Sequence, residues 1–388
     1  MPRQTAFVRP PPIPTQSFQN RVFDFYERFI HCDSSEQITE WYDLTASEIA
    51  PALPKRNEAE FHPDLEKTEA ENARLVTEPF VARDKTGEPI LGYFPGILQS
   101  DVLETTYEAL SEYVDAVKPN RKGGPNTEER DEVVRNDDST AYDQRHPPCP
   151  RLEKLFGHRY RLMHLGAWHA TGHPNEPPVV SGDYIGTAGR LSHGYDLIRS
   201  LMFLTTELSI LFAAFNTLAW SSARRFIAAL NHFHPATNIC KAGDYECWAH
   251  RAFLFNLETH CHRDIRDAMF GYAVIVVFGS FTGGEFVVPQ LRLKFPHRPG
   301  DVIIIKGQLL QHFVTPWKPK EKGGERFCIT HFTHQNLIDS VEERLETIGL
   351  GDETISGVSK KKVKGNQKGS SGDMETGKRK STRNKMKK

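Results

Sequence analysis

The sequence predicts an α+β fold in which an antiparallel β-sandwich or jelly roll forms the core and supporting helices pack on one sheet. Short runs rich in β-branched residues, at 273–278 and 302–306, indicate buried strands. Turn signals separate such runs, with a Gly-Gly pair at 283–284 and Pro-Gly-Asp at 299–301. The apolar segment at 201–220 is long enough for a helix buried against a sheet. Because helices do not alternate with these strands, the pattern favours antiparallel sheets over a βαβ array.

The N-terminal part of the chain is more mixed in character. Residues 1–75 are expected to form a helical extension that includes an amphipathic helix at 18–29. Residues 80–98 resemble two short strands around a turn, and apolar residues at helical spacing predict a helix over 98–117. The polar stretch at 118–150 contains glycine and proline and is expected to be a mobile loop.

The C-terminal half adds two strands and then changes composition. Residues 285–288 and 327–332 complete the strand series. One large domain is therefore expected over residues 76–338. A basic disordered tail, rich in lysine, glycine and serine, is expected over 339–388.

Charge is unevenly distributed along this 388-residue chain, although its formal net charge is only −1. Residues 360–388 contain twelve lysines and arginines against Asp373 and Glu375, so the rest of the chain is acidic. A basic tail suggests contact with an anionic partner, and nucleic acid is the obvious candidate. The runs KKKVK at 360–364 and KRK at 378–380 fit a nuclear-import signal at least as well. A nuclear location follows from either interpretation.

Cysteine usage and hydropathy indicate an intracellular protein. The six cysteines are scattered rather than arranged as a disulfide framework, and the start of the chain lacks the apolar core of a secretory signal. The segment at 201–220 contains Glu207 and Asn216, which would be costly inside a bilayer. No contact with a membrane is expected.

The segment THCHRDIRD at 259–267 has the residue types of a metal site. His262 and Asp264 stand two apart, so on a strand they would project to the same face and chelate one ion. His312 follows 48 residues after Asp264, just past a predicted strand, where a returning strand would deliver a third ligand. Two imidazoles and one carboxylate leave about three positions of an octahedral iron open. His260 forms a competing H-x-H pair with His262, which suits such a site less well.

Two other sets of residues bear on metal chemistry. Arg326 begins the last strand, fourteen residues after His312. A cosubstrate that chelates iron through a keto-acid end leaves a second carboxylate, for which a fixed guanidinium is a natural partner. Separately from the iron site, Cys240, Cys247 and His250 are candidates for a structural zinc site, although their spacing matches no compact zinc finger.

Three motifs resemble the TET/JBP group of 2-oxoglutarate dioxygenases, which oxidise the methyl groups of modified bases in DNA. They are HRDI at 262–265, HFVTP at 312–316 and RFCITHFTH at 326–334, within an iron-binding core at 255–337. The resemblance implies a double-stranded β-helix (jelly-roll or cupin-like) core. It implies Fe(II), 2-oxoglutarate and O2 as cofactors, with ascorbate able to serve as a reductant. The implied iron ligands are His262, Asp264 and His312.

The same resemblance implies roles for four further residues. Arg326 would bind the far carboxylate of 2-oxoglutarate, with Cys328 nearby, where the animal enzymes have serine. His334 would face a flipped base. Asp267 stands where the animal enzymes have a base-contacting asparagine. Since a carboxylate accepts hydrogen bonds from an exocyclic amine, both cytosine and adenine derivatives remain open.

The function implied is oxidation of a methylated base in DNA, with 5-methylcytosine first and N6-methyladenine second. Such chemistry proceeds through a ferryl intermediate and releases succinate and CO2. The base would first be flipped from the duplex at a cost of a few kcal/mol. Two alternatives stay open: a protein or small-molecule hydroxylase, and a non-catalytic chromatin-binding module on the same fold. The oligomeric state does not follow from the sequence.

Overall fold

The computed structural model describes most of the chain between residues 38 and 347. The described ranges are 38–43, 45, 63–117, 149–169, 176–185, 190–269 and 271–347. Three expectations fall outside them: the helix at 18–29, nearly all of the loop at 118–150, and the tail beyond residue 347.

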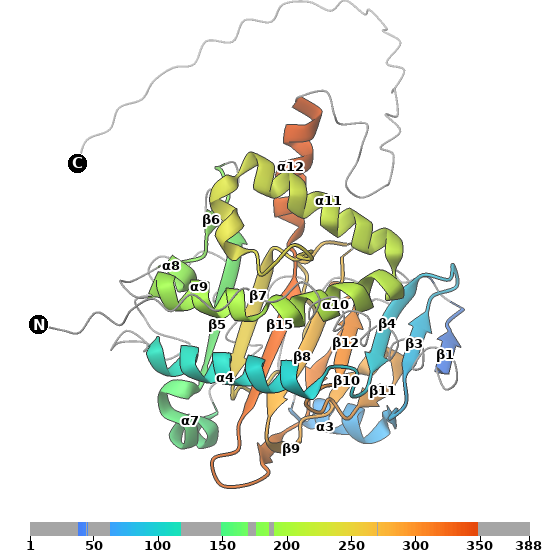
Figure 1. Cartoon of the computed structure of the whole chain (residues 1–388). Helices are drawn as coiled ribbons and strands as arrows, with labels where there is room; N and C mark the ends of the chain where they lie inside the picture. Colours follow the sequence, from blue (N-terminus) through green and yellow to red (C-terminus); the bar gives the residue numbers. More distant parts are fainter. Residues whose placement is uncertain are drawn as a thin grey trace, which may run out of the picture. The chain divides into compact units, whose positions relative to one another are not determined.

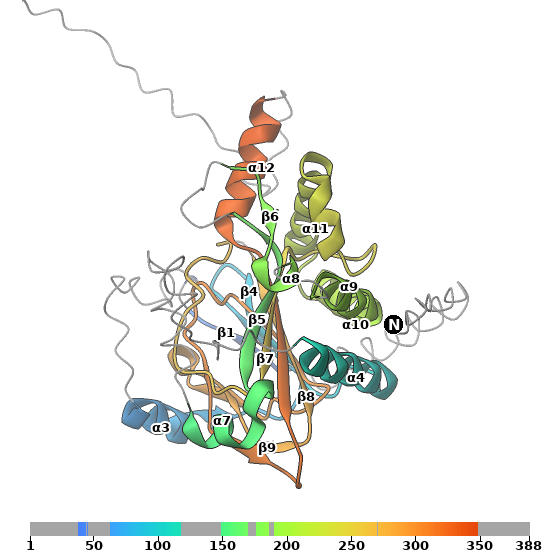
Figure 2. The same ribbon diagram turned by 90° about the vertical axis from the view of Figure 1, so that its left-hand side faces the viewer.

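A nine-stranded sheet runs through the described part of the chain (Figures 1 and 2). In the order in which they pair, its strands are β1 (Ile38–Trp41), β3 (Phe80–Arg83), β4 (Pro89–Phe94), β12 (Val302–Ile305), β8 (Ala273–Gly279), β15 (Arg326–Phe332), β7 (His250–Phe255), β5 (Arg161–Trp168) and β6 (Val179–Val180). The central strands β12, β8, β15 and β7 pair antiparallel. β-branched residues suit such strands because they pack well on a pleated surface that is covered on both faces. The strands predicted at 273–278, 302–306 and 327–332 are confirmed.

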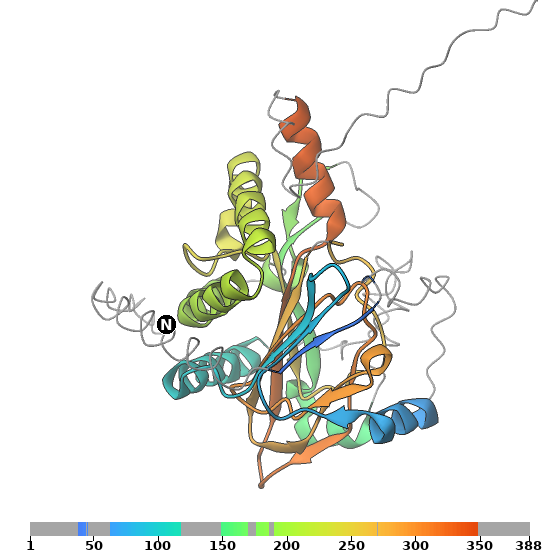
Figure 3. The ribbon, with the colours of Figure 1, turned by 90° about the vertical axis from the view of Figure 1, so that its right-hand side faces the viewer.

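A second sheet contains four short strands (Figure 3). They are β13 (Phe313–Val314), β10 (Phe286–Val288), β11 (Leu293–Phe295) and β2 (Arg74–Leu75), the last of which follows helix α3 (Pro63–Asn72). From β7 onward the chain passes repeatedly between the two sheets: β8, β12 and β15 join the large sheet, whereas β10, β11 and β13 join the small one. This alternation of antiparallel strands is that of a double-stranded β-helix, so the expected jelly-roll core is confirmed.

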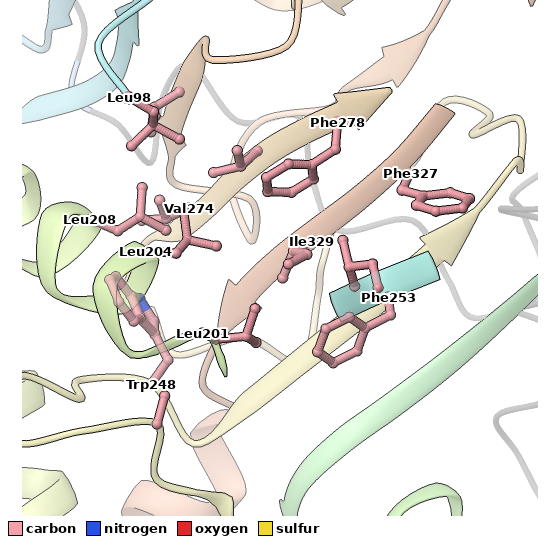
Figure 4. Packing of buried hydrophobic residues seen from close by; sticks show 14 of the residues in the cluster. Leu98, Leu201, Leu204, Leu208, Trp248, Phe253, Val274, Phe278, Phe327 and Ile329 are labelled. Carbon is pink, nitrogen blue, oxygen red and sulfur yellow. The ribbon is translucent and has the colours of Figure 1, made fainter. Parts of the chain in front are cut away.

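Helices cover one face of the large sheet. They are α4 (Ser100–Ala116), α9 (Arg190–Ser200) and α10 (Met202–Phe215). Because side chains alternate across a strand, Val274 and Phe278 of β8 point to this face, where Leu204 and Leu208 of α10 share one apolar cluster with them (Figure 4). Burying a side chain of this size stabilises the fold by about 1.5–3 kcal/mol.

The other face of the large sheet lies against the small sheet. Val277 of β8 and Cys328 of β15 belong to a second apolar cluster that includes Phe286 and Phe295 of the small sheet. The region between the two sheets is the interior of the jelly roll. Alternate side chains of a strand point to the same face, so Arg326, two residues before Cys328 on β15, also faces this interior.

The apolar segment at 201–220 forms two helices, where the sequence predicted one. α10 packs on the sheet as expected, but the helix breaks and α11 (Thr217–Phe233) begins after Asn216. The Asn216 side chain accepts a hydrogen bond from the Ala219 amide at 3.0 Å, which satisfies an amide group at the helix start. α11 then packs through Leu230 against Leu337 of α12 (Gln335–Thr347).

No single helix among the described residues is long and apolar enough to cross a membrane. α9 and α10 meet the criteria of length and composition only as a pair, which is bent by 49°. Most of α10 is buried within the fold.

The remaining elements are short. They are α7 (Pro150–Phe156), α8 (Gly182–Ile185), β9 (Phe281–Gly283), β14 (Trp317–Pro319) and the 3-10 turns Gly157–Arg159, Pro235–Cys240 and Pro289–Leu291. The β3–β4 hairpin and α4 confirm the elements predicted over 80–98 and 98–117. α12 crosses residue 339, where the disordered tail was expected to begin, so residues 339–347 are helical instead.

Candidate metal centre

Two histidines from distant parts of the chain meet at the start of β13. His262 and His312 form an antiparallel bridge, in which the His262 amide donates to the His312 carbonyl at 3.1 Å and the reverse bond measures 2.9 Å. Beyond this bridge the chain turns, and the Asp264 amide donates to the Gly307 carbonyl at 2.8 Å. The expectation that His262 and Asp264 lie on a regular strand is therefore wrong, because only His262 has a strand-like pairing.

The three side chains nevertheless converge. Asp264 Oδ1 lies 3.5 Å from His262 Nε2, and Asp264 Oδ2 lies 3.5 Å from His312 Nε2. One donor atom from each residue lies within 4.8 Å of the other two, and these residues are the only such metal-binding group found among those the structure describes. Two imidazoles and a carboxylate on one side of an ion are the donor set of non-haem Fe(II) oxygenases.

Backbone carbonyl groups fix the orientation of both rings. His262 Nδ1 lies 2.6 Å from the His260 carbonyl oxygen, and His312 Nδ1 lies 3.1 Å from that of Leu310. A carbonyl only accepts, so Nδ1 carries the proton in each ring, and in the neutral form Nε2 has the free lone pair. Each Nε2 is thereby prepared as a metal ligand, and the donor set fits the metal.

Gly307 makes room for the carboxylate ligand. A Cβ atom at this position would lie 2.7 Å from Asp264 Oδ2, closer than any ordinary contact. Gly307 was not identified from the sequence. Its only local signal is a glycine directly after a buried strand, and such glycines have many other uses.

Other potential metal ligands are used differently. The ring of His260 contacts Glu66 at 3.0 Å and lies outside the metal-binding group. Cys240, Cys247 and His250 do not form a metal-binding group either. The Cys247 thiol donates to Ser209 Oγ at 3.7 Å.

Arg326 lies in the jelly-roll interior without an acidic partner among the described residues. It is only 2% exposed, and its guanidinium lies over the ring of Phe281, 5.3 Å from the centroid. Its Nη2 lies 3.4 Å from His297 Nδ1. The adjacent Glu325 is engaged elsewhere, 2.6 Å from Arg159. An arginine keeps its proton in proteins, so this buried cation is prepared for an anion from outside the chain.

A row of rings connects this cation to the metal ligands. The His312 ring stacks on Phe286 at 5.4 Å, and Phe286 meets the edge of His297 at 5.6 Å. His297 then contacts Arg326. A ligand that chelates the metal and carries a second carboxylate would therefore find both partners in one interior. Phe286 and His297 were not identified from the sequence, because neither belongs to a recognisable motif.

Cys328 lies two residues after Arg326 and faces the same interior. Burial raises the pKa of its thiol, while Arg326 acts in the opposite direction. The structure thus brings Cys328 next to the proposed carboxylate site as a neutral, buried side chain.

Asp267 and His334 form a second polar pair in the same domain. They make an antiparallel bridge, and His334 Nε2 lies 3.9 Å from Asp267 Oδ1. The Asp267 amide also donates to the carbonyl of Asp264 at 2.8 Å, so one turn links this pair to a metal ligand.

Aromatic rings surround His334. Trp168 lies at 5.6 Å, His250 at 4.7 Å and Phe332 at 5.2 Å between ring centroids. The His334 amide donates to His250 Nδ1 at 3.3 Å, and burial, followed by His334, lowers the pKa of His250 well below its usual value. Sequence reasoning missed Trp168, although alternation along residues 161–168 would have placed it on the inner face.

Comparison with known proteins finds one family model and one solved structure to report. Residues 252–335 match the family model Tet_JBP, the oxygenase domain of the 2OGFeDO superfamily. The matched segment identifies the chain as a 2-oxoglutarate-dependent dioxygenase, and these residues are similar to the oxygenase domain of the Tet_JBP type. A solved structure titled NgTET1 in complex with 5mC DNA matches with a TM-score of 0.43 and 15% identity, over 84% of this chain and 92% of that one. A comparison with curated protein sequences finds no match.

The 2OGFeDO superfamily, to which the matched Tet_JBP model belongs, implies Fe(II) and 2-oxoglutarate as cofactors. His262, Asp264 and His312 would hold the iron, and Arg326 would bind the distal carboxylate of the cosubstrate. When bound, the iron and its cosubstrate supply the oxidative chemistry, while the protein supplies orientation and exclusion of water.

Proposed function

We propose that this Tet_JBP dioxygenase oxidises a methylated base in DNA, with 5-methylcytosine the first candidate and N6-methyladenine the second. The observation that carries the proposal is the Asp267–His334 pair, one turn from the ligand Asp264 and bordered by aromatic rings. A flat heterocycle with both hydrogen-bond donors and acceptors is the kind of substrate that such a pair recognises.

The chemistry of the two side chains supports a base with an exocyclic amine. A carboxylate accepts hydrogen bonds, so Asp267 would accept from the N–H of such an amine. His334 would donate to a ring nitrogen or carbonyl when its Nε2 is protonated. Cytosine and N6-methyladenine both offer this combination. Trp168 and Phe332 would supply the apolar surface against which the base stacks.

Delivery of the base would involve other parts of the chain. Extruding a base from a duplex costs a few kcal/mol, which phosphate contacts offset through release of counterions. The twelve lysines and arginines at 360–388 are suited to such contacts. The same basic runs support a nuclear location as a further part of this proposal.

The test is to incubate the protein with Fe(II), ascorbate, 2-oxoglutarate, O2 and duplexes carrying either methylated base. Nucleosides and succinate are then measured by mass spectrometry. Oxidised base from wild type, and none from His262→Ala, is the expected result. Succinate without base oxidation would overturn the DNA proposal and point to a protein or small-molecule substrate.

A paired variant tests the recognition step. Asp267→Ala should lower kcat/KM for the base by about tenfold or more, because the base loses one charge-assisted hydrogen bond. Asp267→Asn keeps an acceptor and should retain more of the activity. Equal activity of all three proteins would remove Asp267 from the substrate site.

A further inference from the structure

We infer that Glu66, a residue of helix α3 far from the metal ligands in sequence, is a positioning residue for the iron ligand His262. This inference rests on the iron-binding role of His262, Asp264 and His312. It concerns how one of these ligands is held, and it assigns a function to α3 that no motif in the sequence suggests.

Glu66 binds the metal-ligand segment with both carboxylate oxygens. Its Oε2 lies 3.0 Å from His260 Nδ1, and its Oε1 accepts the hydrogen bond of the Cys261 amide. The side chains are largely sheltered, with 15% of Glu66 and 17% of His260 exposed. Both contacts join residues that are more than 190 positions apart in the chain.

Glu66 and His262 bind the same peptide group, the one that joins His260 to Cys261. The amide of Cys261 and the carbonyl of His260 belong to the same peptide plane, and in a trans peptide they point in opposite directions. Glu66 binds the N–H on one side, while His262 Nδ1–H binds the C=O on the other at 2.6 Å. The carboxylate therefore fixes the orientation of the plane that orients the imidazole.

The same arrangement affects the electronic character of the ligand. A carboxylate that binds a peptide N–H polarises the peptide and makes its carbonyl a stronger acceptor. A stronger hydrogen bond at Nδ1 makes Nε2 a more basic metal ligand. Glu66 would thus act on the metal through the peptide plane and His262, without contacting the metal itself.

α3 is held firmly enough for this role. The strand that follows it, β2, pairs in parallel with β11 of the small sheet. Lys294 Nζ of β11 donates to the carbonyl of Ala70 near the end of α3 at 2.8 Å. Ala70 also packs with Cys261 and Phe313 in a small apolar cluster. Contacts at both its middle and its end thus place α3 beside the segment that carries His262.

If Glu66 had a purely structural role, the result expected for its removal would be different. If Glu66 only fastened α3 to the small sheet, its loss would lower stability and leave the affinity and spectrum of a bound metal unchanged. Metal binding by the full chain therefore separates the two roles, and it does so without measurement of catalysis.

The experiment uses metal-free full-length protein and Co(II), whose visible spectrum reports ligand geometry. Calorimetric titration gives the affinity for wild type, Glu66→Ala, Glu66→Gln and the control Glu71→Ala. Glu71 lies on the same helix, is 65% exposed and pairs with Lys67, so its removal changes charge equally without touching the metal segment. Thermal unfolding of each metal-free protein is recorded alongside.

We expect Glu66→Ala to bind Co(II) about tenfold more weakly, with an altered spectrum, since the loss of outer partners of metal ligands typically costs that much or more. Glu66→Gln should recover most of the affinity, because its amide oxygen still accepts from Cys261. Glu71→Ala should match wild type. If Glu66→Ala does not fold, Glu66→Asp replaces it, since the shorter carboxylate should also weaken binding.

Wild-type affinity and spectrum in Glu66→Ala, or equal losses in Glu66→Ala and Glu71→Ala, would overturn the inference. Failure of wild type itself to bind Co(II) would overturn the metal centre, and the inference with it. The two failures are therefore distinguishable.

Discussion

Two arginines on neighbouring strands are buried on opposite faces of the large sheet. Arg251 of β7 points to the same face as Phe253 and Phe255, the face covered by helices, and it is fully buried. It forms an ion pair with Glu246 and donates to the Cys240 carbonyl at 3.2 Å. Arg326 of β15 lies on the interior side with a comparable burial but without a carboxylate partner among the described residues.

The difference shows how a buried charge indicates function. Desolvating a cation costs several kcal/mol, and the fold offsets that cost for Arg251 with Glu246, whose carboxylate also accepts from the amides of Ala242 and Trp248. For Arg326 no such carboxylate lies among the described residues, and we propose that the distal carboxylate of 2-oxoglutarate supplies the compensating charge. Four predictions follow from this contrast.

The largest effect is expected from Arg251→Met, because it leaves the Glu246 carboxylate buried and uncompensated. The free energy of unfolding should fall by about 3–5 kcal/mol in urea denaturation. The double variant Arg251→Met/Glu246→Gln should recover part of the loss. A single variant as stable as wild type would show that Arg251 is not needed to balance Glu246.

Arg326→Met should weaken the binding of 2-oxoglutarate and leave the stability of the fold unchanged, the opposite of what is expected for Arg251→Met. Its stability should not fall, since no internal carboxylate loses a partner. Its affinity for 2-oxoglutarate, measured by calorimetry on the Co(II)-loaded protein, should fall about 10- to 100-fold, the equivalent of about 1.5–3 kcal/mol for a charged hydrogen bond. Arg326→Lys should lie between the two. A loss of stability as large as that of Arg251→Met would show that Arg326, too, is balanced by a partner within the fold.

Two glycines, Gly284 and Gly323, allow a test of whether 2-oxoglutarate binds beside Arg326. Gly284 and Gly323 have φ of +77° and +82°, so alanine at either position should cost about 1–2 kcal/mol of stability. Only at Gly284 would the added Cβ lie 3.2 Å from Arg326 Nε, whereas nothing lies within 4 Å at Gly323. Gly284→Ala should therefore weaken 2-oxoglutarate binding a few-fold, and Gly323→Ala should not. Equal binding by both variants would contradict the placement of the carboxylate beside Arg326.

The smallest effect concerns pH. Burial, followed by the charge of Arg326, lowers the pKa of His297 well below 6.5, so His297 stays neutral in the folded state. The unfolded chain then binds one more proton below pH 6.5, and stability falls as the pH is lowered through that value. Between pH 6.5 and 5.5 His297 should contribute about 1 kcal/mol of this loss.

His297→Asn is the matching variant, because asparagine tolerates the left-handed backbone at this position, φ +49°. In urea denaturation, the free energy of unfolding should fall between pH 6.5 and 5.5 by about 1 kcal/mol less in the variant than in wild type. An identical pH dependence would mean that His297 is protonated in the folded state or titrates alike in both states.

Several features of the fold and site were predictable from local patterns. The run at 273–278 is β-branched and apolar throughout, and it forms the buried strand β8. The spacing of His262 and Asp264, with His312 after the strand at 302–306, predicted three side chains that the structure brings together, and their role as metal ligands stays a prediction. The break at Asn216 was not predicted, because an apolar composition persists across it. Gly307 and Glu66 were also missed, since each acts on a residue distant in sequence.

The sequence by itself determined the strands and the candidate metal-binding residues, because both depend on residue type and on spacing along the chain. The tertiary structure decided which buried charge is balanced within the fold. Arg251 and Arg326 both lie in apolar strands, but Glu246, five residues before Arg251, meets the guanidinium of Arg251, whereas no carboxylate among the described residues meets that of Arg326. The face of the sheet on which each guanidinium is buried, and the path of the chain around it, decide whether a carboxylate reaches it, and residue type and spacing alone fix neither.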